Sequence, residues 1–206
     1  SAAVNDLARL AAEVCGVQTA LVNIIDDKWQ TSVSCVGGQV DPISRDRTLC
    51  TRTVVERRTI VTTDAREDPR FRDSPYVTGE LAAIRFYVSV PLNTEAGDVV
   101  GTLCVYDTEP RVLGPSEARM LTALARQIVV DYELRKAAAE SAERAQELAA
   151  MAQRAEAMSR MLRTAFEHAP HGSAILGVTG EERGLMLRVN PALAMILARR
   201  DLAGPG

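Results

Sequence analysis

The sequence predicts an α+β domain followed by one very long helix. Over residues 1–110, segments rich in β-forming residues alternate with short helical patterns and with turns rich in Asp, Gly and Pro. Neither Gly nor Pro then occurs from Ser116 to Ala169, a stretch much longer than an ordinary globular helix. We therefore expect a compact first part and an extended helical second part, with the long helix beginning near residue 115.

The strand patterns point to an antiparallel arrangement. Strands are expected at residues 19–26, 29–35, 59–63, 83–92 and 99–107. The first two are separated by the acidic pair Asp26-Asp27, which is typical of a hairpin. In the second strand Trp29, Thr31, Val33 and Cys35 alternate, and we expect them on one face.

Two helices are predicted within the first part. Residues 1–14 carry apolar side chains at helical spacing, including Leu10 and Val14. Residues 48–58 form a shorter helical pattern in which Leu49, Cys50 and Val54 share one face. The turn-rich segment 64–79 is too long for a plain connection, and segments of this length often form binding loops.

The long helix carries a stripe of the kind found in coiled coils. Its strongest members are Leu134, Leu148, Met151, Met158 and Leu162. Apolar spacing of three and four sustained over four heptads favours a parallel homodimer through this helix. The alternative is a single helix lying on another surface. The stripe is weak at Ser141 and Arg144 and rich in Ala, so the dimer should be marginal.

Composition excludes several partners. A net charge of −3 argues against nucleic acid and anionic membrane, and no apolar run is long enough to cross a bilayer. The four cysteines contain no Cys-x-x-Cys pair, so neither a zinc ribbon nor a secreted disulfide framework is expected. We expect a cytoplasmic protein with reduced thiols.

Several segments resemble a GAF domain, above all "IRFYVSVPL" and "GTLCVYDTEPRVL", supported by "DDKWQTSVSCVG" and "TLCTRTV". The resemblance covers residues 1–134. It implies a GAF-like antiparallel sheet with helices on one face and a ligand pocket on the other. Residues 135–165 would be a coiled-coil linker, and residues 166–206 resemble the front of a PAS domain, which we expect to be truncated.

The combination of GAF domain, helix and PAS domain resembles the sensory front of bacterial signalling proteins. It implies a regulatory module that senses a small molecule or redox state and passes the signal through a dimeric helix to an output domain. Our first choice of output is a diguanylate cyclase making cyclic di-GMP; a histidine kinase or PP2C-type phosphatase is the alternative. No GGDEF motif occurs in the sequence, so this fragment itself is not expected to be an enzyme.

No cofactor or metal is expected. The only histidines, His168 and His171, lie beyond the GAF-like region, which argues against proximal-His haem. No Cys-His pair suits bilin attachment, and the residue set of cyclic-nucleotide GAF domains is absent. Pro170 breaks the helix that would align the two histidines on a metal.

Four residues are candidates for a ligand pocket. Arg85 and Tyr87 share a strand face opposite Ile84 and Phe86, Phe71 lies in the covering loop, and Cys50 faces inward from the short helix. Arg85 could instead pair with a loop acid, Asp64 or Asp68, and simply hold the loop in place.

Cys35 and Cys50 are candidates for a thiol-based redox switch. Arg47 and Arg52 flank Cys50, and nearby cations favour a thiolate. Cys35 ends a strand shortly before this segment, so the two thiols could meet. The alternative is that they are small apolar core residues, which we expect of Cys15 and Cys104.

Overall fold

The computed structural model describes residues 2–38, 42–176 and 186–202. The chain divides into two compact units, residues 1–138 and 139–206, which are described separately. Among the described residues no helix is both long enough and apolar enough to cross a membrane.

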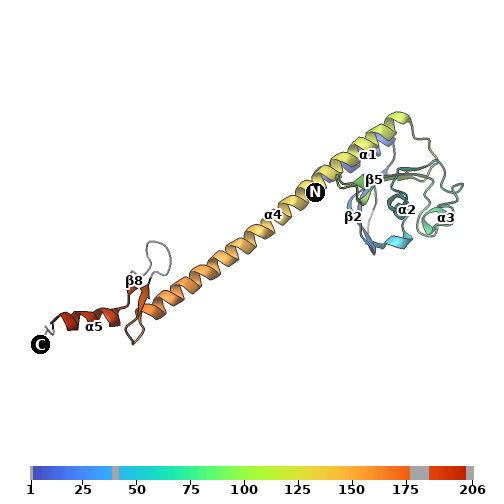
Figure 1. Ribbon diagram of the computed structural model, residues 1–206. Helices are drawn as coiled ribbons and strands as arrows, with labels where there is room; N and C mark the ends of the chain where they lie inside the picture. Colours follow the sequence, from blue (N-terminus) through green and yellow to red (C-terminus); the bar gives the residue numbers. More distant parts are fainter. Residues whose placement is uncertain (1, 39–41, 177–185, 203–206) are drawn as a thin grey trace. The chain divides into compact units, whose positions relative to one another are not determined.

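The first unit is built on a six-stranded sheet (Figure 1). Its elements in chain order are α1 (Ala2–Cys15), β1 (Thr19–Ile25), β2 (Trp29–Val36), β3 (Ile43–Ser44), the 3₁₀ helix η1 (Arg45–Arg47), α2 (Cys50–Glu56), β4 (Ile60–Thr62), α3 (Pro75–Thr78), β5 (Phe86–Asn93), β6 (Val99–Asp107) and the start of α4 (Pro115–Glu167). The strand order is β3-β2-β1-β6-β5-β4, and every neighbouring pair is antiparallel. The predicted antiparallel α+β fold is confirmed.

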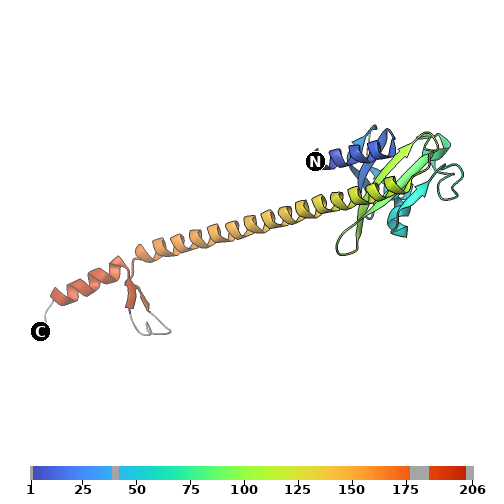
Figure 2. The same cartoon turned by 90° about the horizontal axis from the view of Figure 1, so that it is seen from above.

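Each face of the sheet has its own core. On one face, α1 and the start of α4 pack side by side on inward residues of β1, β5 and β6, such as Val22, Val88 and Leu103 (Figure 2). On the other face, α2 and the loop carrying α3 cover Leu21, Tyr87 and Cys104. The two sets alternate along each strand because successive side chains of a strand point to opposite faces.

The predicted inward face of α1 is partly wrong. The buried residues are Val4, Ala8, Ala11 and Ala12, whereas Leu10 is 46% exposed. Small side chains let the helix approach the sheet closely, so packing distance rather than hydrophobicity alone selects the buried face.

The predicted face of β2 is also wrong, because a bulge interrupts the strand. Val22 of β1 pairs with Ser34, but Asn23 pairs with Ser32, which leaves Val33 as the extra residue. The bulge reverses the alternation, so Cys35 faces the α2 side while Trp29 lies 49% exposed.

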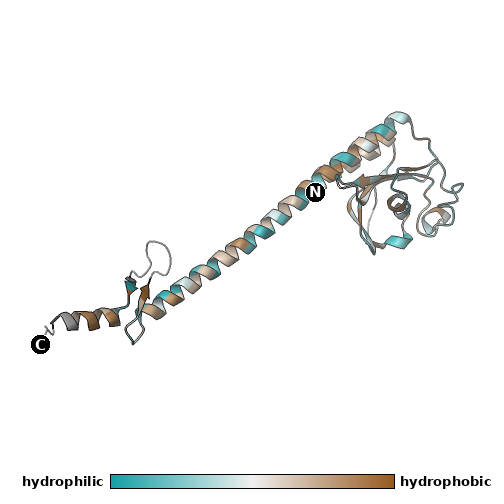
Figure 3. Ribbon diagram, viewed as in Figure 1, coloured by the Kyte–Doolittle hydropathy of each residue, from teal (hydrophilic) through white to brown (hydrophobic). Residues whose placement is uncertain are grey.

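Helix α4 confirms the predicted long helix. Its early turns bury Leu121, Ala125, Ile128 and Val129 against the sheet. Beyond them, apolar and polar residues are interleaved along the helix (Figure 3). All five named members of the predicted stripe are exposed: Leu134 66%, Leu148 68%, Met151 64%, Met158 57% and Leu162 63%.

The second unit holds a small hairpin and a helix besides the end of α4. Strands β7 (Ala174–Leu176) and β8 (Met186–Val189) pair antiparallel, and α5 spans Pro191–Leu202. Fully buried Asn190 links them: its side-chain oxygen accepts from the backbone amides of Ser173 and Leu193, both at 2.9 Å, and so caps α5. Part of the expected PAS-like segment lies outside the described residues.

Candidate functional site

A small cavity lies between the sheet and α2. Its volume is about 110 Å³. Strands β1, β2, β3, β5 and β6 and helices α2 and α3 contribute to its lining, which includes the side chains of Asn23, Gln30, Cys50, Tyr87 and Cys104. One water needs roughly 10–15 Å³ of such space, so the cavity accommodates several waters or a molecule of a few non-hydrogen atoms. We call it the thiol cavity.

Asn23 organises the polar wall of this cavity. Its side chain is fully buried at the centre of β1, and its Oδ1 accepts a hydrogen bond from the Ser32 hydroxyl at 2.5 Å. Its Nδ2 faces the Sγ of Cys50 at 3.4 Å, Thr102 Oγ1 at 3.4 Å and the Sγ of Cys104 at 3.5 Å. A buried amide is stable only when its polar atoms are paired in this way. Asn23 therefore fixes the positions of both sulfurs relative to the sheet.

The thiols of Cys50 and Cys104 touch each other. Their sulfurs are 3.8 Å apart, and the residues are only 4% and 3% exposed. The hydroxyl of Tyr87 donates to the Sγ of Cys50 at 3.3 Å. Within the part of the chain that the structure describes, the sulfur of Cys50 accepts from Asn23, Cys104 and Tyr87, whereas the sulfur of Cys104 accepts from Asn23 and donates to Cys50.

This asymmetry separates the acidities of the two thiols. The hydrogen bond from Cys104 is the main cause that lowers the pKa of Cys50 to about 7, aided by Thr102, Tyr87 and Asn23 and opposed by burial. The pKa of Cys104 is raised well above its ordinary value, first because its proton is held by Cys50 and then by burial. One thiol of the pair thus ionises readily and the other keeps its proton.

The cavity also holds a buried polar atom without a partner. Gln30 is 7% exposed and lines the cavity, yet its Oε1 accepts no hydrogen bond among the described residues. A buried amide oxygen left unpaired costs about 1–3 kcal/mol. Because this oxygen exposes less than 1 Å² to solvent, a donor in the cavity reaches it only after the Gln30 side chain shifts.

The predicted pocket residues separate in the structure. Cys50 and Tyr87 line the thiol cavity, as expected of pocket residues. Phe71 lies beneath the loop and meets the Tyr87 ring edge-on, with centroids 5.4 Å apart. Ile84 lies in the core on the α2 side of the sheet with Tyr87, whereas Phe86 lies in the core on the opposite face, so the predicted shared face of Ile84 and Phe86 is wrong. Strand β5 begins at Phe86, and the alternation of a strand does not apply to Ile84 before it.

Arg85 is not among the residues that line the thiol cavity. Its Nη1 donates to the carbonyls of Val77 and Ile84, at 2.8 and 3.0 Å. The loop acids have other partners, since Asp64 pairs with Arg66 and Asp68 with Arg70, each at 2.6 Å. Arg85 therefore holds the loop by its backbone rather than through either expected acid.

The structure brings the thiol of Cys50 into contact with a thiol other than that of Cys35. Cys35 lies on β2, and Leu21 of β1 separates it from Cys104 of β6. The thiol in contact with Cys50 is that of Cys104, which sequence reasoning assigned to the inert core. A spacing of 54 residues carries no indication of contact; only the antiparallel placement of β6 beside β1 brings them together.

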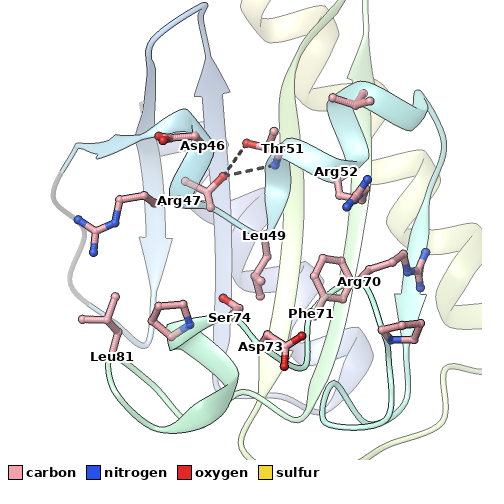
Figure 4. A pocket seen from close by; sticks show the side chains of 14 residues that line it. Asp46, Arg47, Leu49, Thr51, Arg52, Arg70, Phe71, Asp73, Ser74 and Leu81 are labelled. Atoms are coloured by element: carbon pink, nitrogen blue, oxygen red, sulfur yellow. Dashed lines mark hydrogen bonds between the residues drawn. The ribbon is translucent and has the colours of Figure 1, made fainter.

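A larger open groove, of about 650 Å³, lies on the outer side of α2 (Figure 4). Arg47, Arg52 and Arg70 surround it, with Leu49 and Phe71 between them. Arg70 is held by Asp68 and stacks over Phe71, its guanidinium carbon 5.3 Å from the ring centre. The arginines of the α2 region therefore lie on an outer surface, apart from the thiols.

A family model and a set of known proteins identify this architecture. An antiparallel six-stranded sheet with helices on both faces defines the general class of α+β domains. The model of the GAF domain matches residues 1–131, more than half of the chain, and the chain belongs to the GAF domain family.

A cyclic di-GMP phosphodiesterase of Pseudomonas aeruginosa is 38% identical over 123 residues, which make up 58% of this chain and 21% of that protein. The chain thus spans about a fifth of that relative.

Two solved structures show the same fold. The GAF domain of the Acinetobacter phosphoenolpyruvate-protein phosphotransferase superposes with a TM-score of 0.56 at 12% identity, covering 66% of this chain and 84% of that one. The free methionine-R-sulfoxide reductase of Neisseria meningitidis, solved with its substrate, gives 0.54 at 20% identity, covering 66% and 81%. At such identities the likeness concerns the fold alone.

Proposed function

We propose that this chain is the sensory part of an enzyme of cyclic di-GMP signalling. The observation that carries the proposal is the 38% identity to a cyclic di-GMP phosphodiesterase across the GAF region. That relative is a phosphodiesterase, which hydrolyses cyclic di-GMP. It therefore supports a role in cyclic di-GMP signalling but does not favour our first choice of output, a diguanylate cyclase. Because the matched region is 21% of the relative, the chain corresponds to a regulatory part.

The thiol cavity is the proposed sensing site. With about 110 Å³ it is far smaller than the roughly 300–1,000 Å³ of drug-sized ligand pockets. It is too small for a cyclic dinucleotide, so the sensed species is a small polar molecule. Asn23 and Tyr87 line the site, and their donor groups already point at the sulfur of Cys50.

We further propose that the chain forms a homodimer through α4. The stripe containing Leu148, Met151 and Met158 is exposed in the single chain, and an isolated helix cannot bury it. A weak, Ala-rich seam holds alternative registers of similar energy, which suits a two-state transmitter.

The dimer is tested by sedimentation of the whole chain at tens of micromolar. Met151→Lys places a charge in the stripe and should weaken the dimer about tenfold or more, equivalent to at least about 1.4 kcal/mol. Gln153→Lys, an exposed position off the stripe, is the matched control and should leave the mass unchanged. A strictly monomeric unmodified chain would contradict the proposal.

The regulatory role is tested by exchanging domains. The matched 123 residues of the Pseudomonas phosphodiesterase are replaced by those of this chain, and cyclic di-GMP hydrolysis is measured. We expect a folded hybrid whose activity responds to changes in the cavity, such as Gln30→Leu, but not to Leu81→Ala on the outer groove. A hybrid whose activity is the same with and without Gln30→Leu would refute the sensory role.

A further inference from the structure

The structure brings two reduced thiols into contact inside a cavity. Cys50 begins α2, and Cys104 lies in the middle of β6. Their sulfurs are 3.8 Å apart, about the sum of their radii, and both residues are free cysteines. Asn23 faces both sulfurs, so the pair is held in a fixed orientation rather than meeting by chance.

We propose that Cys50 and Cys104 form a reversible disulfide when a small hydroperoxide enters the thiol cavity. The site differs from the pair suggested by the sequence, because Cys104 takes the place of Cys35. The proposal rests on the proposed sensory function only where disulfide formation is taken as a signal. The reaction itself involves residues of the GAF domain alone.

The cavity suits a small oxidant and excludes a large one. Hydrogen peroxide is little larger than water, and about 110 Å³ holds several molecules of that size. Bulky reagents cannot reach the sulfurs, since Cys50 and Cys104 are only 4% and 3% exposed.

The reaction has two balanced steps. The Cys50 thiolate attacks one oxygen of the hydroperoxide, the O–O bond breaks, and an alcohol (water, for hydrogen peroxide) leaves with the thiol's proton, giving a sulfenic acid. Cys104 sulfur then attacks the Cys50 sulfur, the S–O bond breaks, and water leaves as the disulfide forms. Two thiols are oxidised by two electrons, and the peroxide is reduced.

Cys50 is the better candidate for the attacking thiol. It accepts hydrogen bonds from Tyr87 and Asn23, which favour its thiolate, whereas Cys104 holds its proton as a donor to Cys50. A cellular dithiol reductant reverses the reaction by ordinary thiol–disulfide exchange.

Disulfide formation requires the two sulfurs to come closer. A disulfide brings the sulfurs to about 2.05 Å, so the present contact must shorten by roughly 1.8 Å. Cys104 lies in a strand bonded on both sides, to β1 at Leu21 and to β5 at Ser89, whereas α2 is a seven-residue helix on the sheet surface. Rotation of the Cys50 side chain or a shift of α2 therefore supplies the shortening, and the thiol cavity, which both cysteines line, changes shape.

The test is peptide mapping after mild peroxide. The reduced 206-residue chain is treated with hydrogen peroxide, unfolded, alkylated and digested with trypsin. The four cysteines fall on separate tryptic peptides, at 10–28, 29–45, 48–52 and 86–111. We expect a cross-link between 48–52 and 86–111 that disappears on treatment with dithiothreitol.

Variants assign the steps. Cys35→Ser is the matched control and should leave the yield of this cross-link within about twofold. Cys104→Ser should abolish it and leave Cys50 as a sulfenic acid, which dimedone traps when it is present as the oxidised chain is unfolded. Because either cysteine variant could fold poorly, the mapping of the unmodified chain decides the matter by itself.

Two outcomes would overturn the proposal. One is a cross-link joining 29–45 to 48–52, which would restore the pairing of Cys35 with Cys50. The other is complete oxidation of Cys35 while Cys50 and Cys104 stay fully alkylatable after unfolding. Both results concern the chain alone, so they are independent of the domain exchange that tests the link to cyclic di-GMP.

Discussion

Tyr87→Phe changes the acidity of the buried thiol pair with little change in packing. The tyrosine hydroxyl donates to the Sγ of Cys50 at 3.3 Å, and the ring meets Phe71 edge-on. Phenylalanine keeps the ring contact and removes only the donor. A hydrogen bond to a charged group contributes about 1.5–3 kcal/mol, and we use the lower value because Asn23 and Cys104 still face the sulfur.

That loss raises the pKa of Cys50 by about one, since one pKa unit corresponds to 1.36 kcal/mol. At pH values below the pKa of Cys50, which its hydrogen bonds hold below the ordinary thiol value, the thiolate fraction then falls by up to about tenfold. The initial rate of peroxide oxidation of Cys50 in that range should fall by up to about tenfold, and its pH midpoint should move upward.

The assay is the rate of appearance of the oxidised 48–52 peptide as a function of pH. Tyr106→Phe is the matched control, because Tyr106 lines the same cavity but its hydroxyl is not among the donors to Cys50. An unchanged pH midpoint in Tyr87→Phe, with the fold intact by circular dichroism, would refute the assignment of Tyr87 as a donor that stabilises the thiolate.

The same shift predicts how stability depends on pH. The pKa of Cys50 in the folded chain, about 7, lies below the ordinary thiol value of 9.0. A lowered pKa stabilises the fold fully above the ordinary value, and this contribution is lost as the pH falls through the folded value. The free energy of unfolding should thus rise between pH 7 and 9, and Tyr87→Phe should reduce the rise.

Three further changes test the fold around the site. Gly101→Ala should destabilise the chain by about 2 kcal/mol or more in urea unfolding, because its Cβ would lie 1.9 Å from the carbonyl oxygen of Asn23; an unchanged midpoint would contradict the close strand approach. Phe71→Ala should cost about 3 kcal/mol, against about 0.5 kcal/mol or less for half-exposed Leu81→Ala, and equal costs would show that the loop is not packed. The hydrogen bond from the Arg70 side chain lowers the pKa of Asp68 to about 2, so the unmodified chain should lose stability as the pH falls from 4 to 2. Because solvent screens part of this interaction, the expected loss is about 1 kcal/mol. The Asp68→Asn variant should not show this loss.

The strands were predictable because their evidence is local. Alternating β-formers between turn residues placed β1, β5 and β6 within a few residues of their observed bounds. The bulge at Val33 was not predictable, since it depends on how β2 pairs with β1. As a result, the sequence placed Cys35 on the same face as Trp29, whereas the structure separates them.

The sequence by itself determined the order of the longer elements, the long α4 without Gly or Pro, and the inward face of α2 that carries Cys50, but it missed the short β3, η1 and α3. It also indicated a polar residue, Tyr87, on the sheet face beneath α2. These properties depend on neighbours a few positions apart, where helix and strand periodicity apply directly.

Only the tertiary structure decided which thiol meets Cys50. The answer depends on strand order and register, which place β6 beside β1 and set Leu21 between Cys35 and Cys104. The burial of Asn23 is decided in the same way, because an amide in the middle of a strand is stable inside only when residues distant in sequence supply its partners.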